Sequence, residues 1–177
     1  MKKVIALGLS FVLVLAVFAG CSGGEEGDTD EEETDTVSTA SIVSEEADFQ
    51  DAISEDGTWI IITTEDLSFD EELIVEGEFR NQDDSDADLY RKLALYDQDD
   101  DRNVTERYTV EAPRLTVRSP NTKIQGGTFV GDVYVEEDGF VIEDAEVDGN
   151  VYFAEEDYEE SAELVNGGEV TGDMTVE

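Results

Sequence analysis

Apolar residues in the last third of the chain recur at regular intervals. Three segments align without a gap: IQGGTFVGDVYV (124–135), IEDAEVDGNVYF (142–153) and VNGGEVTGDMTV (165–176). The alignment places similar residues in columns, such as Ile124, Ile142 and Val165, or Val135, Phe153 and Val176. The interval from Ile124 to Ile142 is too short for a pair of helices. It suits three short strands and three turns, stacked on the next repeat at a strand spacing of about 4.8 Å.

A glycine followed by Asp or Asn marks the same turn in each repeat: Gly131, Gly149 and Gly172. Such a pair favours a turn with positive φ. Leu115 and Val117 lie one repeat before Val133 and Val135, so the pattern extends one step towards the N-terminus. The second interval is longer than the first, and its extra residues fall in EEDYEESAE (155–163), which predicts a bulged turn. The apolar columns then form an inner wall that only neighbouring repeats can bury.

The N-terminal part predicts one short helix followed by strands. Ser44 is a favourable N-cap, and Phe49, Ala52 and Ile53 form an apolar stripe. Strands are predicted where apolar residues alternate or cluster, over 59–63, 67–79, 91–96, 106–111 and 114–119. Polar stretches between them predict a surface loop over 81–88 and a hairpin tip over 97–103. We therefore predict an all-β fold, a short single-domain parallel β-helix over residues 44–177 with an N-terminal capping helix and its clearest coils in 115–177.

Two resemblances bear on this fold. Residues 48–77, DFQDAISEDGTWIIITTEDLSFDEELIVEG, resemble the capping helix and first coil of right-handed β-helices of the pectin-lyase-like class. The glycine-marked coils that follow resemble bactofilin-like, polymer-forming β-helix proteins, which implies a right-handed solenoid whose ends pair into filaments. A six-residue beat is typical of left-handed hexapeptide β-helices, which stay the alternative: Phe129, Val135, Val141, Val147 and Phe153.

Residues 1–20 have the layout of a bacterial lipoprotein signal peptide, with two lysines, a long apolar run and small residues before Cys21. The ending VFAGC resembles a lipobox, which implies that Cys21 is lipidated and becomes the new N-terminus. Residues 21–43 are rich in Gly, Ser, Thr and acids and predict a disordered tether. The expected location is extracytoplasmic, lipid-anchored to the cell membrane, or to the outer membrane of a two-membrane cell.

Acidic residues dominate the composition. The chain has 48 Asp and Glu against 10 Lys and Arg, and its formal net charge is −38. Such a chain has no basic surface to neutralise phosphates, which excludes ordinary nucleic-acid binding. Two explanations of the acids stay open. They either adapt the surface to high salt, where about 1 M salt shortens the Debye length to about 3 Å, or they bind cations.

The residue inventory argues against an enzyme. The chain has no histidine, hence no imidazole acid, base or metal ligand, and close carboxylate pairs are uninformative among 48 acids. The best metal candidates alternate like the start of a Ca²⁺-binding EF-hand loop: Asp97, Asp99, Asp101 and Asn103. Arg102 and Tyr108 stand where that loop needs Gly and Glu. We expect no cofactor, and Ca²⁺ binding at these residues is the alternative.

Two surfaces are candidates for contacts with other molecules. The last repeat ends in Met174 and Val176, and open solenoid ends invite end-to-end pairing. Tyr134 and Tyr152 lie one repeat apart between inward valines, so they should point outward as a ladder that could bind a partner. We predict a non-enzymatic surface lipoprotein whose β-helix is a structural or self-associating scaffold of the cell envelope. The alternative is a glycan- or protein-binding module, including a Ca²⁺-dependent adhesin.

Overall fold

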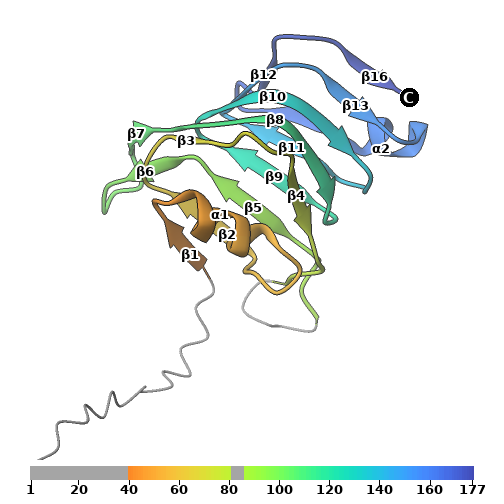
Figure 1. Ribbon diagram of the computed structural model, residues 1–177. Coiled ribbons are helices and arrows are strands. Elements are labelled where there is room, and N and C mark those ends of the chain that lie inside the picture. The colour runs from red at the N-terminus through yellow and green to blue at the C-terminus, as the bar shows by residue number, and fades with distance from the viewer. Residues whose placement is uncertain (1–39, 81–85) are drawn as a thin grey trace, which may run out of the picture. The chain divides into compact units, whose positions relative to one another are not determined.

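A computed structural model describes residues 40–80 and 86–177 of the chain (Figure 1). Nearly all of its regular structure is β, and the strands of the two main sheets pair in parallel. The predicted all-β fold built on parallel strands is thus confirmed. The described residues belong to one compact unit, Thr36–Glu177. The predicted signal peptide and lipidation site, with most of the predicted tether, lie outside the described residues.

The first sheet contains one strand from each successive turn of the chain. Its order follows the sequence: β1 (Ala40–Val43), β2 (Ile60–Thr63), β5 (Arg91–Ala94), β9 (Thr122–Gln125), β11 (Val141–Glu143) and β14 (Glu163–Val165). β1 pairs with β2 in parallel over its whole length, so the predicted tether ends before Ala40 rather than at Val43. The prediction failed here because ASIV follows a polar run and is too short to indicate a strand by itself.

The second sheet contains the other two thirds of each turn. Along the stack it consists of β3 (Leu67–Ser68) with β4 (Leu73–Glu76), β8 (Thr109–Arg118), β10 (Thr128–Val135), β12 (Glu146–Asp148) with β13 (Val151–Phe153), and β15 (Glu169–Val170) with β16 (Met174–Val176). The register of β10 shifts between Val130 and Asp132, where Gly131 has a φ of 135°. We call one strand of the first sheet with the two segments that follow it a rung.

The pairing registers reproduce the repeat seen in the sequence. Ile124 lies beside Ile142, and Val133 lies beside both Leu115 and Val151. Each of these steps equals one sequence repeat. Equivalent positions of successive repeats therefore stack, and their side chains contact one another in the core. The interior residues are almost fully buried, including Ile61, Leu93, Leu115, Ile124, Val133, Val135, Ile142, Val147, Val151 and Phe153.

The last repeat departs from the prediction in two ways. Ile142 pairs with Leu164 rather than with Val165, which lies beside Glu143. One extra residue is accommodated in the turn of Asn166 and Gly167, both with positive φ, so the later columns return to the predicted alignment. The stretch predicted to be a bulged turn instead contains a helix, α2 (Glu156–Ser161). Its Tyr158 packs against the core, which the acidic sequence around it did not indicate.

The capping helix is present as α1 (Glu46–Ile53), and Phe49, Ala52 and Ile53 are its buried residues. Its N-cap is Glu45, without a side-chain hydrogen bond, so the prediction of Ser44 was wrong by one position. β6 (Tyr96–Gln98) and β7 (Val104–Arg107) pair antiparallel, which confirms the predicted hairpin. Of the loop predicted over 81–88, residues 81–85 lie outside the described part.

Candidate functional site

The last rung leaves apolar side chains at the surface. β14, β15 and β16 are the outermost strands at this end of both sheets, and Figure 1 shows β16 at the edge of the second sheet. Leu164 and Val176 continue the inward columns of Ile142 and Phe153, yet they are 42% and 38% exposed. Met174, the other predicted assembly residue, packs partly against the core. The structure thus places Met174 and Val176 together in an outer rung that no further strand covers within the described residues.

The opposite end of the stack is closed by α1. The helix contacts β1, β2 and β4, and it buries Phe49 almost completely. The ring of Phe49 lies 5.6 Å from the ring of Phe69, centroid to centroid. At this end α1 covers the interior and β1 is the edge strand of the first sheet, whereas the other end is formed by β14, β15 and β16.

Arg91 fastens α1 to the rungs beneath it. The side chain is fully buried, and its guanidinium donates to the carbonyl oxygens of Glu76 at 2.6 Å, Ala52 at 2.6 Å and Ser54 at 3.1 Å. Its Cζ lies 3.9 Å from the centre of the Phe79 ring. Burial lowers the pKa of Arg91 to about 10, and the group remains a cation at neutral pH. A buried cation on the last carbonyls of a helix also complements the helix dipole.

Both lysines of the described chain lie on the outer face of the first sheet. Lys92 of β5 and Lys123 of β9 are direct neighbours in the register. Residues next to them in sequence point the other way, since Leu93 and Ile124 are buried in the core. Lys123 forms an ion pair with Glu143 on the following strand. In a chain with 48 acids, this clustering of the lysines is the clearest feature of the charge distribution.

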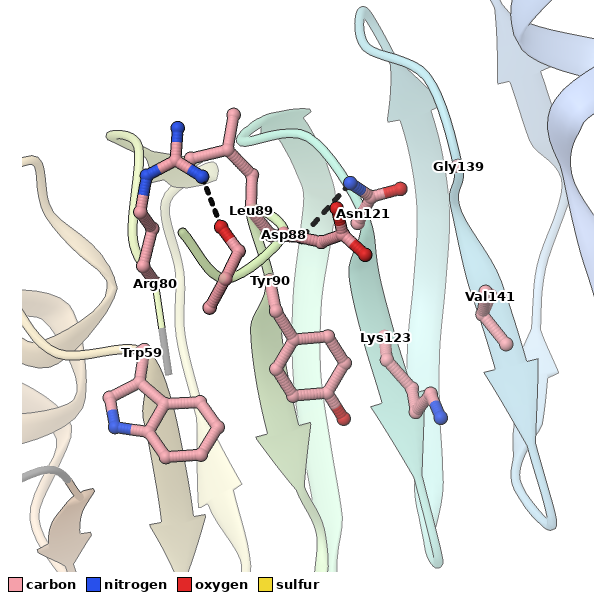
Figure 2. A pocket seen from close by; sticks show the side chains of 10 residues that line it. Trp59, Arg80, Asp88, Leu89, Tyr90, Asn121, Lys123, Gly139 and Val141 are labelled. Atoms are coloured by element: carbon pink, nitrogen blue, oxygen red, sulfur yellow. Dashed lines mark hydrogen bonds between the residues drawn. The ribbon is translucent and has the colours of Figure 1, made fainter. Parts of the chain in front are cut away.

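Aromatic side chains flank the two lysines. The rings of Trp59 and Tyr90 are 5.8 Å apart, and the ammonium of Lys123 lies 5.7 Å from the centre of the Tyr90 ring. Figure 2 shows Trp59, Tyr90 and Lys123 side by side across neighbouring strands. All three line a cleft of about 920 Å³. The indole nitrogen of Trp59 is buried and has no hydrogen-bond partner among residues 40–80 and 86–177. We call Trp59, Ile60, Tyr90, Lys92, Tyr96 and Lys123 the lysine face.

The pKa values of Tyr90, Lys123 and Glu143 depend on one another. Burial raises the pKa of Tyr90, and the nearby positive charge of Lys123 opposes the shift. For Lys123 burial favours the neutral form, but the hydrogen bond to Glu143, together with Tyr90 and the charge of Glu143, outweighs it and raises the pKa of Lys123. The hydrogen bond from Lys123 lowers the pKa of Glu143. The pair is therefore ionised at neutral pH.

Sequence reasoning missed the lysine face, although one signal was present. Tyr96 lies against Gly126, where an added Cβ would come within 2.1 Å of the tyrosine ring. Gly126 has a φ of 92°, so both space and conformation require glycine. The pair of glycines at 126–127 thus marks the place where an aromatic residue from the preceding rung lies over the turn.

The predicted tyrosine ladder is present in the register. Tyr134 pairs directly with Tyr152, and both are half-buried on the outer face of the second sheet. The guanidinium carbon of Arg114 lies 5.4 Å from the centre of the Tyr134 ring. Thr175 continues the column on the last rung, as predicted.

The acidic hairpin brings two of its four predicted metal ligands together, Asp99 and Asn103. Asp99 accepts hydrogen bonds from the backbone and side-chain nitrogens of Asn103, which lowers its pKa. Asp97 accepts a 2.8 Å hydrogen bond from the hydroxyl of Tyr108, whose pKa is raised by burial and by the two neighbouring carboxylates. Within the described ranges, no three acidic or cysteine side chains are grouped so that they could hold a metal ion. A backbone hydrogen bond from Asp101 also helps to lower the pKa of Asp99.

Comparisons with known proteins give no family for this chain. No protein-family model matches it, and no curated protein or solved structure matches it either. The resemblance to bactofilin-like proteins therefore stays a prediction. No helix within residues 40–80 and 86–177 is long and apolar enough to cross a membrane. Lipidation of Cys21 likewise stays a prediction, because that residue lies outside the described part.

Proposed function

We propose that the chain is a surface lipoprotein whose folded unit is a parallel β-helix, a non-enzymatic scaffold that self-associates through its last rung. Three strand segments per sequence repeat, with their columns in parallel register, support the β-helix. We expect the right-handed form. The scaffold assignment rests on this stacking of rungs and on the difference between its two ends.

The observation that carries the proposal is the exposed apolar edge of the last rung. Edge strands present unpaired backbone groups to other chains and are normally protected by charge or by a covering element. α1 provides such cover at the first end. At the second end α2 contacts β13 and β16, and Leu164 and Val176 remain exposed. Contact with a second last rung would bury them.

The closed first end decides the geometry of association. A filament by head-to-tail stacking needs both ends open, and at the first end α1 covers the interior and leaves β1 as the edge strand of the first sheet. Two copies that meet last rung to last rung are related by a two-fold axis, so the same residues meet on both sides and the assembly closes at two. Strands that face each other across this axis run antiparallel. We therefore propose a tail-to-tail dimer in place of the filament that the resemblance implied.

Charge makes this dimer dependent on salt. Glu163, Glu169, Asp173 and Glu177 all lie exposed on the last rung, and two copies bring both sets of carboxylates together. At about 1 M salt the Debye length falls to about 3 Å, and this repulsion is largely screened. Burial of Leu164 and Val176 then favours the dimer.

The test is light scattering on residues 36–177, which contain the described core, from low salt to about 3 M. The expected result is a doubling of mass with salt. Val176→Glu should weaken dimerisation at least tenfold, about 1.4 kcal/mol, because it places a charge in the contact. Val104→Glu is the matched control, since Val104 is 39% exposed on the hairpin. A monomer at every salt concentration would rule out self-association, and continued growth in mass would rule out the two-fold arrangement.

Anchoring at Cys21 is a separate part of the proposal. Mass spectrometry of the protein from its native membrane should find a lipid-modified residue 21 at the N-terminus. Cys21→Ser should release the protein from the membrane fraction. An unmodified cysteine in membrane-bound protein would contradict the anchor without affecting the dimer.

A further inference from the structure

The lysine face contains an ammonium group with no acidic partner. Lys92 Nζ donates a 3.0 Å hydrogen bond to the hydroxyl of Tyr96 and lies 5.2 Å from the centre of that ring. No carboxylate of the described residues is within ion-pair distance of it, whereas neighbouring Lys123 is paired with Glu143. The charge of Lys92 acts on Glu143 only from farther away, where it helps to lower the pKa of that carboxyl. An ammonium has three donors, and a tyrosine hydroxyl accepts one. In a chain of net charge −38, the fold thus keeps one lysine available for an acceptor from outside.

Beside Lys92 the face is mainly apolar. The lining of a trough of about 280 Å³ includes Ile42, Ile60, Ile62, Ala94 and Tyr96, with Lys92 at its side. Thr64, Asp97 and Gln98 complete the lining, and the Asp97 carboxylate already accepts a hydrogen bond from Tyr108. Ile42 is 72% exposed, the highest value among the large hydrophobic residues that the structure describes. Exposed apolar surface rimmed by polar groups is typical of protein contact sites. Tryptophan and tyrosine, present here as Trp59, Tyr90 and Tyr96, are the residues that most often dominate such contacts.

The chemistry of the trough selects the class of ligand. A carboxylate is the natural partner of Lys92, because charge-assisted hydrogen bonds are the stronger ones. The isoleucines offer no hydrogen bonds, so sugar hydroxyls placed over them would lose their partners at a cost. Branched aliphatic side chains would gain from the same position. A peptide segment with a carboxylate next to an apolar side chain can bind both Lys92 and the isoleucine trough.

We propose that the lysine face binds an extended acidic segment of a partner protein, with a Glu or Asp carboxylate on Lys92 and an apolar side chain in the isoleucine trough. The remaining acids of the molecule repel such a segment at low salt. High salt screens that repulsion while contacts at hydrogen-bond distance persist. The face lies on the side of the stack, away from the last rung, so binding does not compete with the tail-to-tail contact.

The experiment uses residues 36–177 at about 1 M salt and three blocked peptides: Glu-Ile-Glu-Ile-Glu, its Gln-for-Glu counterpart and its Lys-for-Glu counterpart. Binding is measured by nuclear magnetic resonance titration, with the Trp59 indole N–H as one reporter. The Glu peptide should bind at least tenfold more tightly than the other two. Its shifts should fall on Trp59, Ile60, Lys92 and Ala94. Glucuronate oligosaccharide is the fourth probe.

Matched variants decide whether Lys92 carries the interaction. Lys92→Gln should weaken binding of the Glu peptide about tenfold, and Lys92→Arg should restore most of it. Arg114→Gln removes the same charge from a residue that also lies over a tyrosine, on the other sheet, and should change nothing. Val176→Glu should leave binding intact, which separates this proposal from the dimer. Equal binding of the Glu and Gln peptides, equal losses in the Lys92 and Arg114 variants, or tighter binding of the glucuronate probe would overturn the proposal.

Discussion

Replacing Arg91 by methionine should destabilise the folded unit by about 3 kcal/mol. The methionine keeps much of the side-chain volume but leaves the carbonyls of Ala52, Ser54 and Glu76 without their donor. Hydrogen bonds from a charged donor contribute about 2 kcal/mol each. The lowered pKa of about 10 indicates that burial of the charge costs about 3 kcal/mol, which offsets half of the three bonds. The difference is the predicted loss.

The assay is urea unfolding at fixed high salt, followed by far-ultraviolet circular dichroism and by the fluorescence of Trp59, the single tryptophan of the chain. Arg91→Met should lower the midpoint with an unchanged slope. Arg91→Lys should lie between, because one ammonium cannot reproduce the fork of the guanidinium. Arg114→Met, at an exposed position, should stay within about 0.5 kcal/mol of the original. If Arg91→Met also stays within that range, the guanidinium does not hold α1 in place.

Single contacts support three further predictions. Gly126→Ala should cost at least about 1 kcal/mol more than Gly167→Ala in urea unfolding, because both glycines have positive φ but only Gly126 has a ring, that of Tyr96, against it; equal costs would show that the ring moves freely. The lowered pKa of Glu143 means that its contribution to stability is present above about pH 4.3 and is lost as the pH falls through its folded pKa, so Glu143→Gln should flatten this part of the acid titration. Millimolar Ca²⁺ should raise the melting temperature no more than Mg²⁺ does, since Asn103 already occupies Asp99; a Ca²⁺-specific rise that Asp99→Asn abolishes would contradict this.

The repeat made much of the core predictable. Apolar residues return to the same columns in every repeat, and stacking of neighbouring repeats leaves them a single way to be buried together. The pair of Val133 and Val151 therefore followed directly from the sequence. The last repeat was less predictable because its turn contains one residue more. Leu164 and Val165 are equally apolar, and only the turn at Gly167 decides which of them lies beside Ile142.

The lysine face could not be derived in the same way. Lys92 and Lys123 are distant in the sequence, and the hairpin between them hides the register that makes them neighbours. Arg91 is adjacent to Lys92 and carries the same charge, yet its side chain points inward and is fully buried. The packing of α1 decides that Arg91 is buried and Lys92 is not. The local sequence pattern does not predict this difference.

The most direct test of the tail-to-tail dimer is the distance between spin labels on two copies, measured by pulsed electron resonance at about 3 M salt. Thr175→Cys places the label on the exposed last rung, and Ile42→Cys places it near the covered end. Residues 36–177 contain no other cysteine. A tail-to-tail dimer predicts a short distance between labels at 175 and a much longer one between labels at 42. A short distance between a label at 42 on one copy and a label at 175 on another would contradict it and show head-to-tail stacking.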